Sequence, residues 1–211
     1  DIHSPKKFVV SSLFQYKTIY QNISFPQVIK PYKGEKGKKV FINITSFQQA
    51  IACLKAIFTE STAAVVEEFV QGNDLRLLCL NQKIIGACQR WPSQVIGDGK
   101  STIIQLINQE NQKRKVLEKV NQRRTLSPID TSPDLTLSLK TQGLSKKYIT
   151  SPHQPILPFL INNVSKGGQV RTVNIDTIHS TIRSQAINLV RHLKLNFASV
   201  DYIVKDLSQP A

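Results

Sequence analysis

Apolar and polar residues alternate along this chain with periods that predict both strands and helices. Short apolar runs bounded by turn residues predict strands at 8–10, 26–31, 40–44, 63–66 and 200–204. Apolar residues spaced three or four positions apart predict amphipathic helices over 47–58 and 182–193. Two further helices are expected, one that begins near Ser11 or Ser12 and one near Thr102, because these hydroxyl groups can cap a helix.

The middle of the chain predicts a hairpin. Residues 75–80 and 83–90 are apolar runs that flank Asn81-Gln82, a pair suited to a tight turn. Helices and strands therefore follow one another without a regular βαβ repeat. This order predicts an α+β fold with antiparallel sheets in two layers or lobes.

The composition agrees with a folded chain of this size. The 211 residues leave room for one large domain or two small lobes, and 40% hydrophobic residues suffice for a sizeable core. Residues 108–150 differ from their surroundings, because they are polar, rich in lysine and poor in aromatic residues. We expect them to form a polar, basic insertion.

The charge balance favours a partner that carries negative charge. Lys and Arg number 28 against 14 Asp and Glu, which gives a formal net charge of +14. Part of the excess lies in one basic cluster, namely Lys113, Arg114, Lys115, Lys119, Arg123 and Arg124. The cluster is interpreted either as a solvated helix face or as a surface that binds an anion or nucleic acid. The lack of interleaved aromatic residues argues against a single-strand stacking platform, so nucleic acid is not the expected partner.

Several classes of protein and site are disfavoured by what the sequence lacks. No apolar run approaches the roughly 18 residues of a membrane span, and the start of the chain lacks a signal-peptide pattern. A cytoplasmic protein without a membrane partner is expected. Three cysteines at irregular spacing make no disulfide framework, and the four histidines show no metal-ligand spacing. The chain has no methionine and stops just after a strand-like run, so we expect it to be a piece of a longer protein.

Charged residues follow two of the predicted strands. Lys30 ends an apolar strand beside the glycine and lysine loop 34–40, where a lysine can place its charge on a phosphate or simply be exposed. Glu67 and Glu68 follow the next apolar strand and could face a ligand with amino or hydroxyl donors. Neither pattern is specific by itself, since the loop lacks the Gly-Lys-Ser/Thr of a Walker motif.

Two further positions combine charge with strand alternation. Asp74 and Arg76 share one face of a strand, which suits either a ligand contact or a surface ion pair. Asp201 lies inside an apolar strand between Val200 and Tyr202. A carboxylate there is costly to bury unless it is paired or binds a metal, and the other interpretation is a position that faces solvent.

These segments, taken in order, resemble the ATP-grasp superfamily over about residues 8–205. Residues 65–76 resemble the hinge strand that holds adenine and ribose in that superfamily. Residues 95–107, with their Gly-Asp-Gly-Lys sequence, are similar to cyanophycin synthetases and to the ligase half of bifunctional glutathione synthetases. Residues 159–168 and 198–203 also resemble ribosomal-protein glutamate ligases.

The resemblance implies a fold and a set of cofactors. The fold would have two α/β lobes with antiparallel sheets that sandwich the nucleotide, an N-terminal lobe over 1–66 and a C-terminal lobe over 67–211. The implied activity is ATP-dependent carboxylate–amine ligation through an acyl phosphate, with ATP and Mg²⁺ as cofactors. The substrate would be an amino acid or peptide, and such ligases are often homo-oligomers.

The resemblance also implies roles for individual residues. Nucleotide contacts are implied for Lys30, Gly34, Gly37, Lys38, Glu67, Glu68, Val70 and Asp74. Lys30 and the loop would contact the phosphates, Glu67 the adenine and Asp74 the ribose. Catalytic roles are implied for Arg76, Arg90 and Lys166, substrate contacts for Asn163, Gly167 and Gly168, and a magnesium ligand for Asp201.

The chain departs from the superfamily's pattern at two places. Lys39 stands where relatives usually have glycine, and a side chain there can hinder the approach of the loop to phosphate. Residues 158–161 read Pro-Phe-Leu-Ile, where relatives have an arginine and further polar residues. Two alternatives therefore accompany the ligase interpretation: a nucleotide-binding domain of the same fold without ligase activity, and a basic nucleic-acid-binding module.

Overall fold

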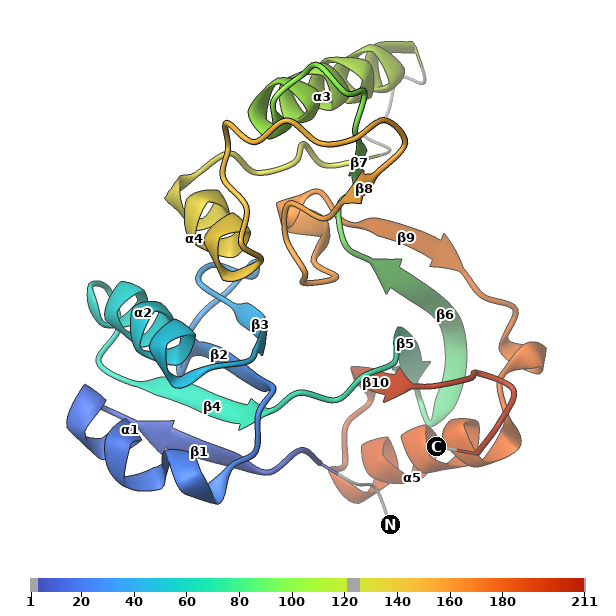
Figure 1. Cartoon of the computed structure of the whole chain (residues 1–211). Helices are drawn as coiled ribbons and strands as arrows, with labels where there is room; N and C mark the ends of the chain where they lie inside the picture. The colour runs from blue at the N-terminus through green and yellow to red at the C-terminus, as the bar shows by residue number, and fades with distance from the viewer. Residues whose placement is uncertain (1–3, 121–125, 211) are drawn as a thin grey trace. The chain divides into compact units, whose positions relative to one another are not determined.

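The chain forms two compact units in a computed structural model that describes residues 4–120 and 126–210 (Figure 1). Among these residues, unit 1 comprises residue 4, residues 70–91 and residues 170–210. Unit 2 comprises residues 5–69 and residues 92–169, apart from 121–125. Both units therefore combine segments from distant parts of the chain. The lobes predicted from the sequence, 1–66 and 67–211, stay a prediction.

Unit 2 contains a four-stranded sheet of β1 (Lys7–Val10), β2 (Gln27–Pro31), β3 (Phe41–Ile44) and β4 (Ala64–Glu68). The strand order is β1-β4-β2-β3, and the pairs β1–β4, β4–β2 and β2–β3 are antiparallel. All four strands were predicted from the sequence. The antiparallel register places Val28 opposite Glu67 and Lys30 opposite Val65. Lys30 and Glu67 are therefore diagonal neighbours on one face of the sheet.

Two helices, α1 (Leu13–Ile19) and α2 (Phe47–Phe58), pack against the same core as this sheet. A short 3-10 turn, η1 (Tyr20–Asn22), follows α1. The hydroxyls of Ser12 and Ser46 accept backbone N–H groups of the first turns and cap the two helices. The rings of Tyr16 and Phe47 stack with centroids 5.7 Å apart, which joins the helices to each other.

The rest of unit 2 builds a second core. Its elements are β7 (Val95–Ile96), α3 (Ile103–Val120), α4 (Pro133–Thr141), β8 (Pro155–Ile156) and the 3-10 turn η2 (Val164–Lys166). β7 pairs antiparallel with β8. The sequence predicted the start of α3, and one interpretation of the basic cluster placed that cluster on a helix face; α4 was not predicted. Apolar side chains of both helices are nevertheless fully buried, as at Ile103 and Leu135.

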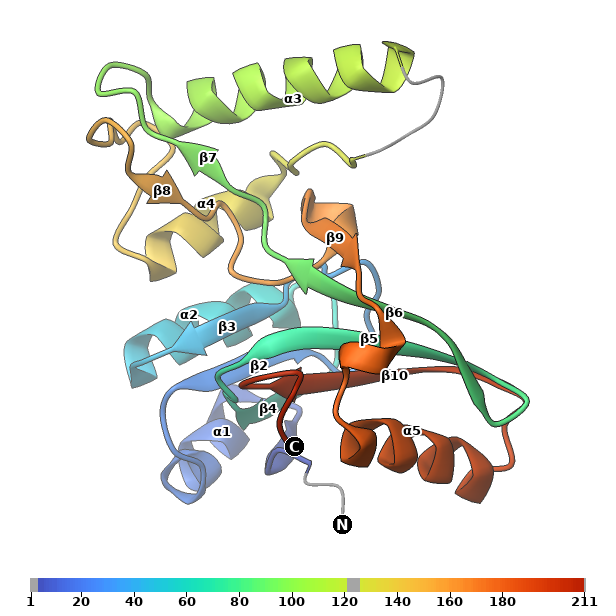
Figure 2. The same cartoon turned by 90° about the vertical axis from the view of Figure 1, so that its right-hand side faces the viewer.

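Unit 1 contains a four-stranded sheet covered by one helix (Figure 2). The strands are β5 (Asn73–Leu80), β6 (Lys83–Trp91), β9 (Gln169–Thr172) and β10 (Phe197–Val204), in the order β10-β5-β6-β9. The turn η3 (Ile175–Thr177) precedes α5 (Ser180–His192). Asn81 and Gln82 close the hairpin with φ of 46° and 61°, the left-handed values that a tight two-residue hairpin turn requires. The predicted hairpin is therefore confirmed.

The alternation of strand residues divides this sheet into an apolar and a charged face. Leu75 and Leu77 are fully buried and share a core with Ile182 and Ala186 of α5. Because side chains alternate along a strand, the neighbouring Asp74 and Arg76 lie on the opposite face. Burial of the apolar face thus fixes which way the charged residues point.

Replacement of Leu77 tests this arrangement. Leu77→Ala removes a fully buried side chain, so we expect it to lower the free energy of unfolding by about 2–5 kcal/mol. Leu80→Ala, on the same strand but 39% exposed, is the matched control and should cost much less. Urea denaturation followed by circular dichroism measures both. Equal losses for the two variants would contradict the assignment of Leu77 to the core.

Candidate functional site

Four charged residues predicted from the sequence meet on the charged face of the unit 1 sheet. Asp74 and Arg76 come from β5, Arg90 from β6 and Asp201 from β10. The strand register places Asp74 opposite Arg90 and Arg76 opposite Asp201. Residues directly opposite each other in an antiparallel pair share a face, so the register alone brings the four side chains together. We call them the Arg–Asp cluster.

The two arginines hold the two carboxylates through several bonds. Arg76 donates from Nε to Asp201 Oδ1 at 2.7 Å and from Nη2 to Oδ2 at 2.8 Å, a bidentate pair. Arg90 Nε lies 2.7 Å and its Nη2 2.6 Å from Asp74 Oδ1. Arg90 Nη2 also lies 3.2 Å from Asp201 Oδ2. Asp201 therefore bridges both arginines.

Burial differs within the Arg–Asp cluster. The side chains of Arg90 and Asp74 are 15% and 12% exposed, whereas those of Arg76 and Asp201 are 41% and 46% exposed. Burial alone raises the pKa of Asp201, but the hydrogen bond from Arg76 and the charges of Arg90 and Arg76 outweigh it and lower the pKa. The pKa of Arg76 is raised in turn, mainly by its hydrogen bond to Asp201. Each partner of the Arg76–Asp201 pair thus favours the charged form of the other, and this outer pair faces solvent.

The Lys30 and Glu67 side chains form an ion pair in unit 2. Lys30 Nζ lies 2.7 Å from Glu67 Oε1, with the two side chains 36% and 17% exposed. The Glu68 side chain has a different partner: its Oε2 accepts a hydrogen bond from the backbone N–H of Lys6 at 3.3 Å. Val70, which belongs to unit 1, is 43% exposed. The structure thus brings together two of the residues predicted to contact the nucleotide, and gives Glu68 a backbone partner.

The loop 34–39, predicted to contact phosphate, is fixed by contacts within unit 2. Lys38 Nζ lies 2.5 Å from one carboxylate oxygen of Glu60, and Lys39 Nζ lies 2.9 Å from the other. Hydrogen bonds from Lys38 and Lys39 lower the pKa of Glu60 to about 2. Gly37 has φ of +70°, and an added Cβ would lie 2.7 Å from Ile161 Cδ1. Only glycine fits this close approach without displacement of its neighbours.

The structure gives the Lys39 side chain a structural role at the position where relatives usually have glycine. Its φ of 53° lies in the left-handed region that glycine adopts readily and that other residues adopt at a cost. The side chain lies along the end of α2, where Nζ donates to Ala56 O at 2.6 Å and to Thr59 Oγ1 at 2.7 Å. A cation at a helix C-terminus is favourable because free carbonyl groups point outward there. The side chain is therefore used inside unit 2.

The segment 163–168 is a tight turn. The side-chain oxygen of Asn163 accepts a hydrogen bond from the N–H of Ser165, and the main-chain carbonyl of Asn163 accepts one from the N–H of Gly168. Gly167 has φ of +85°, and an added Cβ would lie 2.6 Å from Ile129 Cα. Asn163 and Gly167 therefore have structural reasons for their identities. The structure does not test their predicted role in substrate binding.

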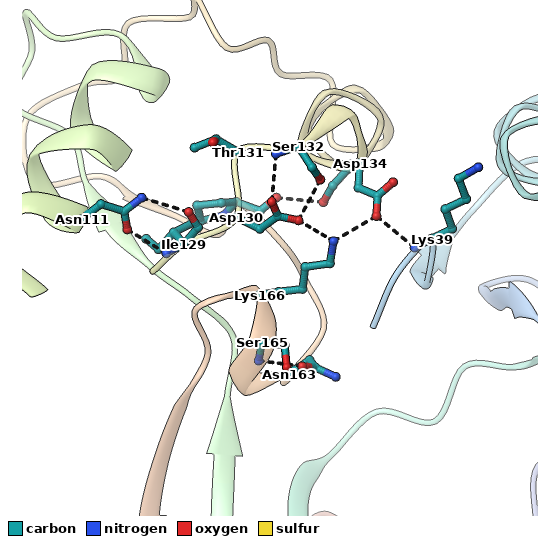
Figure 3. A network of polar contacts seen from close by, with 12 residues as sticks. Lys39, Asn111, Ile129, Asp130, Thr131, Ser132, Asp134, Asn163, Ser165 and Lys166 are labelled. Carbon is teal, nitrogen blue, oxygen red and sulfur yellow. Dashed lines mark hydrogen bonds and ion pairs between the residues drawn. The ribbon is translucent and has the colours of Figure 1, made fainter. Parts of the chain in front are cut away.

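Lys166 is a buried cation with two carboxylate partners (Figure 3). Its side chain is 7% exposed, and Nζ lies 2.5 Å from Asp130 Oδ2 and 2.9 Å from Asp134 Oδ2. Nζ also lies 5.1 Å from the centre of the Phe159 ring, within range of a cation–π contact. Although burial raises the pKa of Asp130, hydrogen bonds from Lys166 and Ser132 outweigh it and lower the pKa. A buried cation with this set of partners is strongly held in place.

A pocket of about 720 Å³ opens beside this network in unit 2. Its charged lining comes from the 34–39 loop, the end of α2, the start of α4 and η2: Lys36, Lys38, Lys39, Glu60, Asp130, Asp134 and Lys166. Sequence reasoning missed Glu60, Asp130 and Asp134. One signal was present, because Ser132-Pro133-Asp134 has the cap, first-turn proline and acidic residue of a helix start.

The Gly-Asp-Gly-Lys sequence forms a structural turn. Asp98 Oδ1 accepts the N–H groups of Lys100 and Ser101, and these bonds lower the pKa of Asp98 to about 2. An added Cβ on Gly97 would lie 2.1 Å from Thr150 Oγ1, so only glycine fits there. These residues thus determine the shape of the turn that precedes α3.

The basic cluster predicted on residues 113–124 is partly a structural feature. Arg114 is buried, and its Nη1 donates to Ser127 O at 2.6 Å and to Gly167 O at 2.8 Å. Arg123 and Arg124 lie outside the described residues.

In residues 4–120 and 126–210, no helix is long and apolar enough to cross a membrane. In the same residues, no group of three or more His, Cys, Asp or Glu residues could hold a metal ion.

Comparisons with known proteins agree with the family suggested by the sequence. Cyanophycin synthetase of Trichormus variabilis is 30% identical over 193 residues, which cover 88% of this chain and 20% of that protein. The glutathione biosynthesis bifunctional protein GshAB of Listeria innocua is 30% identical over 197 residues, which cover 92% of this chain and 24% of that protein. The chain thus spans about a fifth to a quarter of the length of these curated relatives.

Structural comparison supports the same fold. The crystal structure of D-alanine–D-alanine ligase from Bacillus anthracis matches 96% of this chain and 48% of that chain, with a TM-score of 0.54 and 12% identity. At that identity the likeness concerns the fold alone, and it confirms the predicted α+β ATP-grasp class. Residues 1–112, more than half of the sequence, match the family model of the RimK-like ATP-grasp domain. The chain therefore belongs to the RimK-like ATP-grasp family.

Proposed function

We propose that this chain is the nucleotide-binding portion of an ATP-dependent carboxylate–amine ligase that acts on an amino acid or peptide. Membership of the ATP-grasp family supports the reaction class. The observation that carries the proposal is the Arg–Asp cluster, in which Arg76 and Asp201 keep 41% and 46% of their side chains exposed. A pair of opposite charges on an otherwise ordered strand face is suited to a charged ligand.

The proposed reaction has two steps. A carboxylate oxygen of the substrate attacks the γ-phosphorus of ATP, the bond from that phosphorus to ADP breaks, and an acyl phosphate forms. An amine then attacks the acyl carbon, the carbon–oxygen bond to phosphate breaks, and the nitrogen loses a proton as the amide forms. The first step brings two anions together, so cations must face the transferred phosphoryl group. We assign this role to Arg76 and Arg90.

The two arginines suit different parts of this task. Arg90 is largely buried and tied to Asp74 and Asp201, which fixes the direction of its guanidinium group. Arg76 is the more exposed and has Asp201 as its carboxylate partner. Arg76 can therefore donate one N–H group to a phosphate oxygen. Arg90 stays bound to its carboxylates and supplies a fixed positive charge beside it. A planar guanidinium that already holds a carboxylate also matches the geometry of a phosphate.

Asp201 fits the expected magnesium ion as a single protein ligand. Mg²⁺ is usually held by one or two carboxylates together with phosphate oxygens and water, so a half-exposed carboxylate beside a nucleotide suffices. We propose that Asp201 takes this role and that Arg76 and Arg90 hold its carboxylate in orientation beforehand. When bound, Mg²⁺ supplies further neutralisation of phosphate charge.

For the nucleotide itself we propose the contacts implied by the family resemblance. Lys30 would contact phosphate and Glu67 the adenine amino group, and their ion pair holds both side chains in fixed positions. Asp74 would bind the ribose hydroxyls. Main-chain groups of Glu68 and Val70 would contact the ring edge, and Gly34, Gly37 and Lys38 the phosphates.

On the substrate side, Asn163, Gly167 and Gly168 are proposed contacts. For Lys166 the bonds to Asp130 and Asp134 favour a role in positioning this turn over direct contact with the reacting atoms.

Binding of magnesium ADP is the first test. Ligand at 100 times its dissociation constant stabilises the folded chain by about 2.7 kcal/mol. For a chain of this size that corresponds to a rise in melting temperature of about 5–10 °C. A thermal-shift measurement with and without magnesium ADP checks it. A full-length protein that shows no shift would contradict nucleotide binding.

Variants then separate the proposed contacts from general charge effects. Lys30→Ala and Asp74→Ala each remove a charged hydrogen-bonding group, so we expect affinity for magnesium ADP to fall by about tenfold or more. Lys115→Ala removes a charge from an exposed position on α3 and should leave the affinity unchanged. Isothermal titration calorimetry measures all three. Equal affinities would reject the assignment of Lys30 and Asp74.

Phosphate release distinguishes the ligase from a domain that only binds nucleotide. With ATP, Mg²⁺, a carboxylate substrate and an amine, the full-length protein should release phosphate, and Arg76→Ala should lower the rate by about a hundredfold. Amino acids and short peptides are the substrates to screen. Tight magnesium ADP binding without phosphate release from any pair would contradict the ligase activity and leave the nucleotide-binding alternative.

A further inference from the structure

The loop 34–39 has a backbone conformation that its own sequence does not favour. Lys36, Gly37 and Lys39 have φ of 54°, 70° and 53°. Glycine adopts such values freely, but in the two lysines the Cβ atom makes this conformation unfavourable. Contacts from elsewhere in unit 2 must therefore hold the loop in this form.

Those contacts converge on Lys39. Its side chain is anchored at the end of α2 by the bonds from Nζ described above. Its backbone N–H points the other way and donates to Asp134 Oδ2 at 3.0 Å. The residue therefore joins the loop to two different helices, α2 through the side chain and α4 through the main chain.

Asp134 is itself held in place. Its side chain is 12% exposed, and the same Oδ2 atom accepts Lys166 Nζ at 2.9 Å. Figure 3 shows the Asp134 carboxylate between the Lys166 ammonium group and the backbone of Lys39. We call Lys39, Asp134 and Lys166 the loop clasp.

We propose that Asp134 is an internal anion that holds the 34–39 loop in a docked form and competes with the phosphates of the nucleotide for the Lys39 amide. The inference rests on the proposed function, in which this loop contacts phosphate. A carboxylate oxygen on a loop N–H makes the same kind of charge-assisted hydrogen bond that a phosphate oxygen makes.

Competition follows from the geometry of one donor and two anions. The Lys39 N–H can point at one strong acceptor, and a phosphate oxygen brought up to it would meet the Asp134 carboxylate with like charge. The loop must leave Asp134 before this amide can reach a phosphate. The docked form therefore weakens nucleotide binding. The apparent Kd equals the intrinsic Kd divided by the fraction of molecules in which the loop is released.

The chain offers a closely matched control. Asp130 is the second carboxylate on Lys166, and its Oδ2 accepts the same ammonium group. Its other hydrogen bonds go to Ser132, and none is made to the 34–39 loop. Asp130→Asn therefore removes one negative charge from the same place, as Asp134→Asn does, without a change in the loop contact.

Hydrogen exchange of the loop amides tests the clasp without nucleotide. We expect the Lys39 amide to exchange about tenfold or more faster in Asp134→Ala, by an intermediate factor in Asp134→Asn, and at the wild-type rate in Asp130→Asn. NMR-detected exchange on the whole chain measures this. Should Asp134→Ala fail to fold, the two asparagine variants decide, and equal exchange in them overturns the proposal.

Calorimetric titration with magnesium ADP tests the competition. Asp134→Asn should bind about three- to tenfold more tightly than Asp130→Asn, which carries the same net charge. Equal or weaker binding by Asp134→Asn overturns the competition, even if its loop exchanges faster. Absence of magnesium ADP binding by the wild-type full-length protein would contradict the proposed function instead, and the exchange measurement would still decide whether Asp134 holds the loop.

Discussion

A shortage of carboxylates governs the polar structure of this chain. The 28 basic residues outnumber the acidic ones two to one, and several carboxylates accept hydrogen bonds from more than one donor. A buried charge without a partner costs several kcal/mol, which makes this sharing a strong constraint. Asp201 forms ion pairs with Arg76 and Arg90, and Glu60 forms ion pairs with Lys38 and Lys39. Asp134 accepts hydrogen bonds from Lys166 and from the backbone amide of Lys39. Each of these acidic residues therefore connects two parts of its unit.

The same constraint changes the meaning of the positive charge. A net charge of +14 suggests a broad surface for polyanions, yet Lys39, Arg90, Arg114 and Lys166 are largely or fully buried and act inside the fold. Arg114 donates hydrogen bonds to the carbonyl groups of Ser127 and Gly167, and the second of these bonds joins α3 to the turn that contains Lys166. The basic cluster on α3 thus loses one of its members to the core. Of the cluster residues that the structure describes, Lys113, Lys115 and Lys119 remain exposed on α3.

Local sequence patterns were enough for most of the elements and for three of the four residues of the Arg–Asp cluster. Strand alternation placed Asp74 and Arg76 on one face, and the apolar neighbours of Asp201 marked it as unusual. The contact between Arg76 and Asp201 joins residues 125 positions apart, and the register that creates it has no local signal. Asp130 and Asp134 were missed for a related reason. Their segment is polar and was treated as an insertion, although Ser132-Pro133-Asp134 marks a helix start and buried Leu135 and Leu139 follow.

The Arg–Asp cluster and the loop clasp share one physical principle. In both, an internal carboxylate occupies donors that an anionic ligand would use: the guanidinium groups of Arg76 and Arg90 in one unit, and the Lys39 amide in the other. Donors kept in use this way stay oriented before a ligand arrives, which lowers the cost of arranging them on binding. The ligand must still displace or share each carboxylate. Where a metal ion can accept the displaced carboxylate, as proposed for Asp201, the exchange keeps its charges balanced. Asp134 keeps its ion pair with Lys166 when the Lys39 amide leaves but loses one hydrogen bond, so nucleotide binding must supply the free energy of that loss.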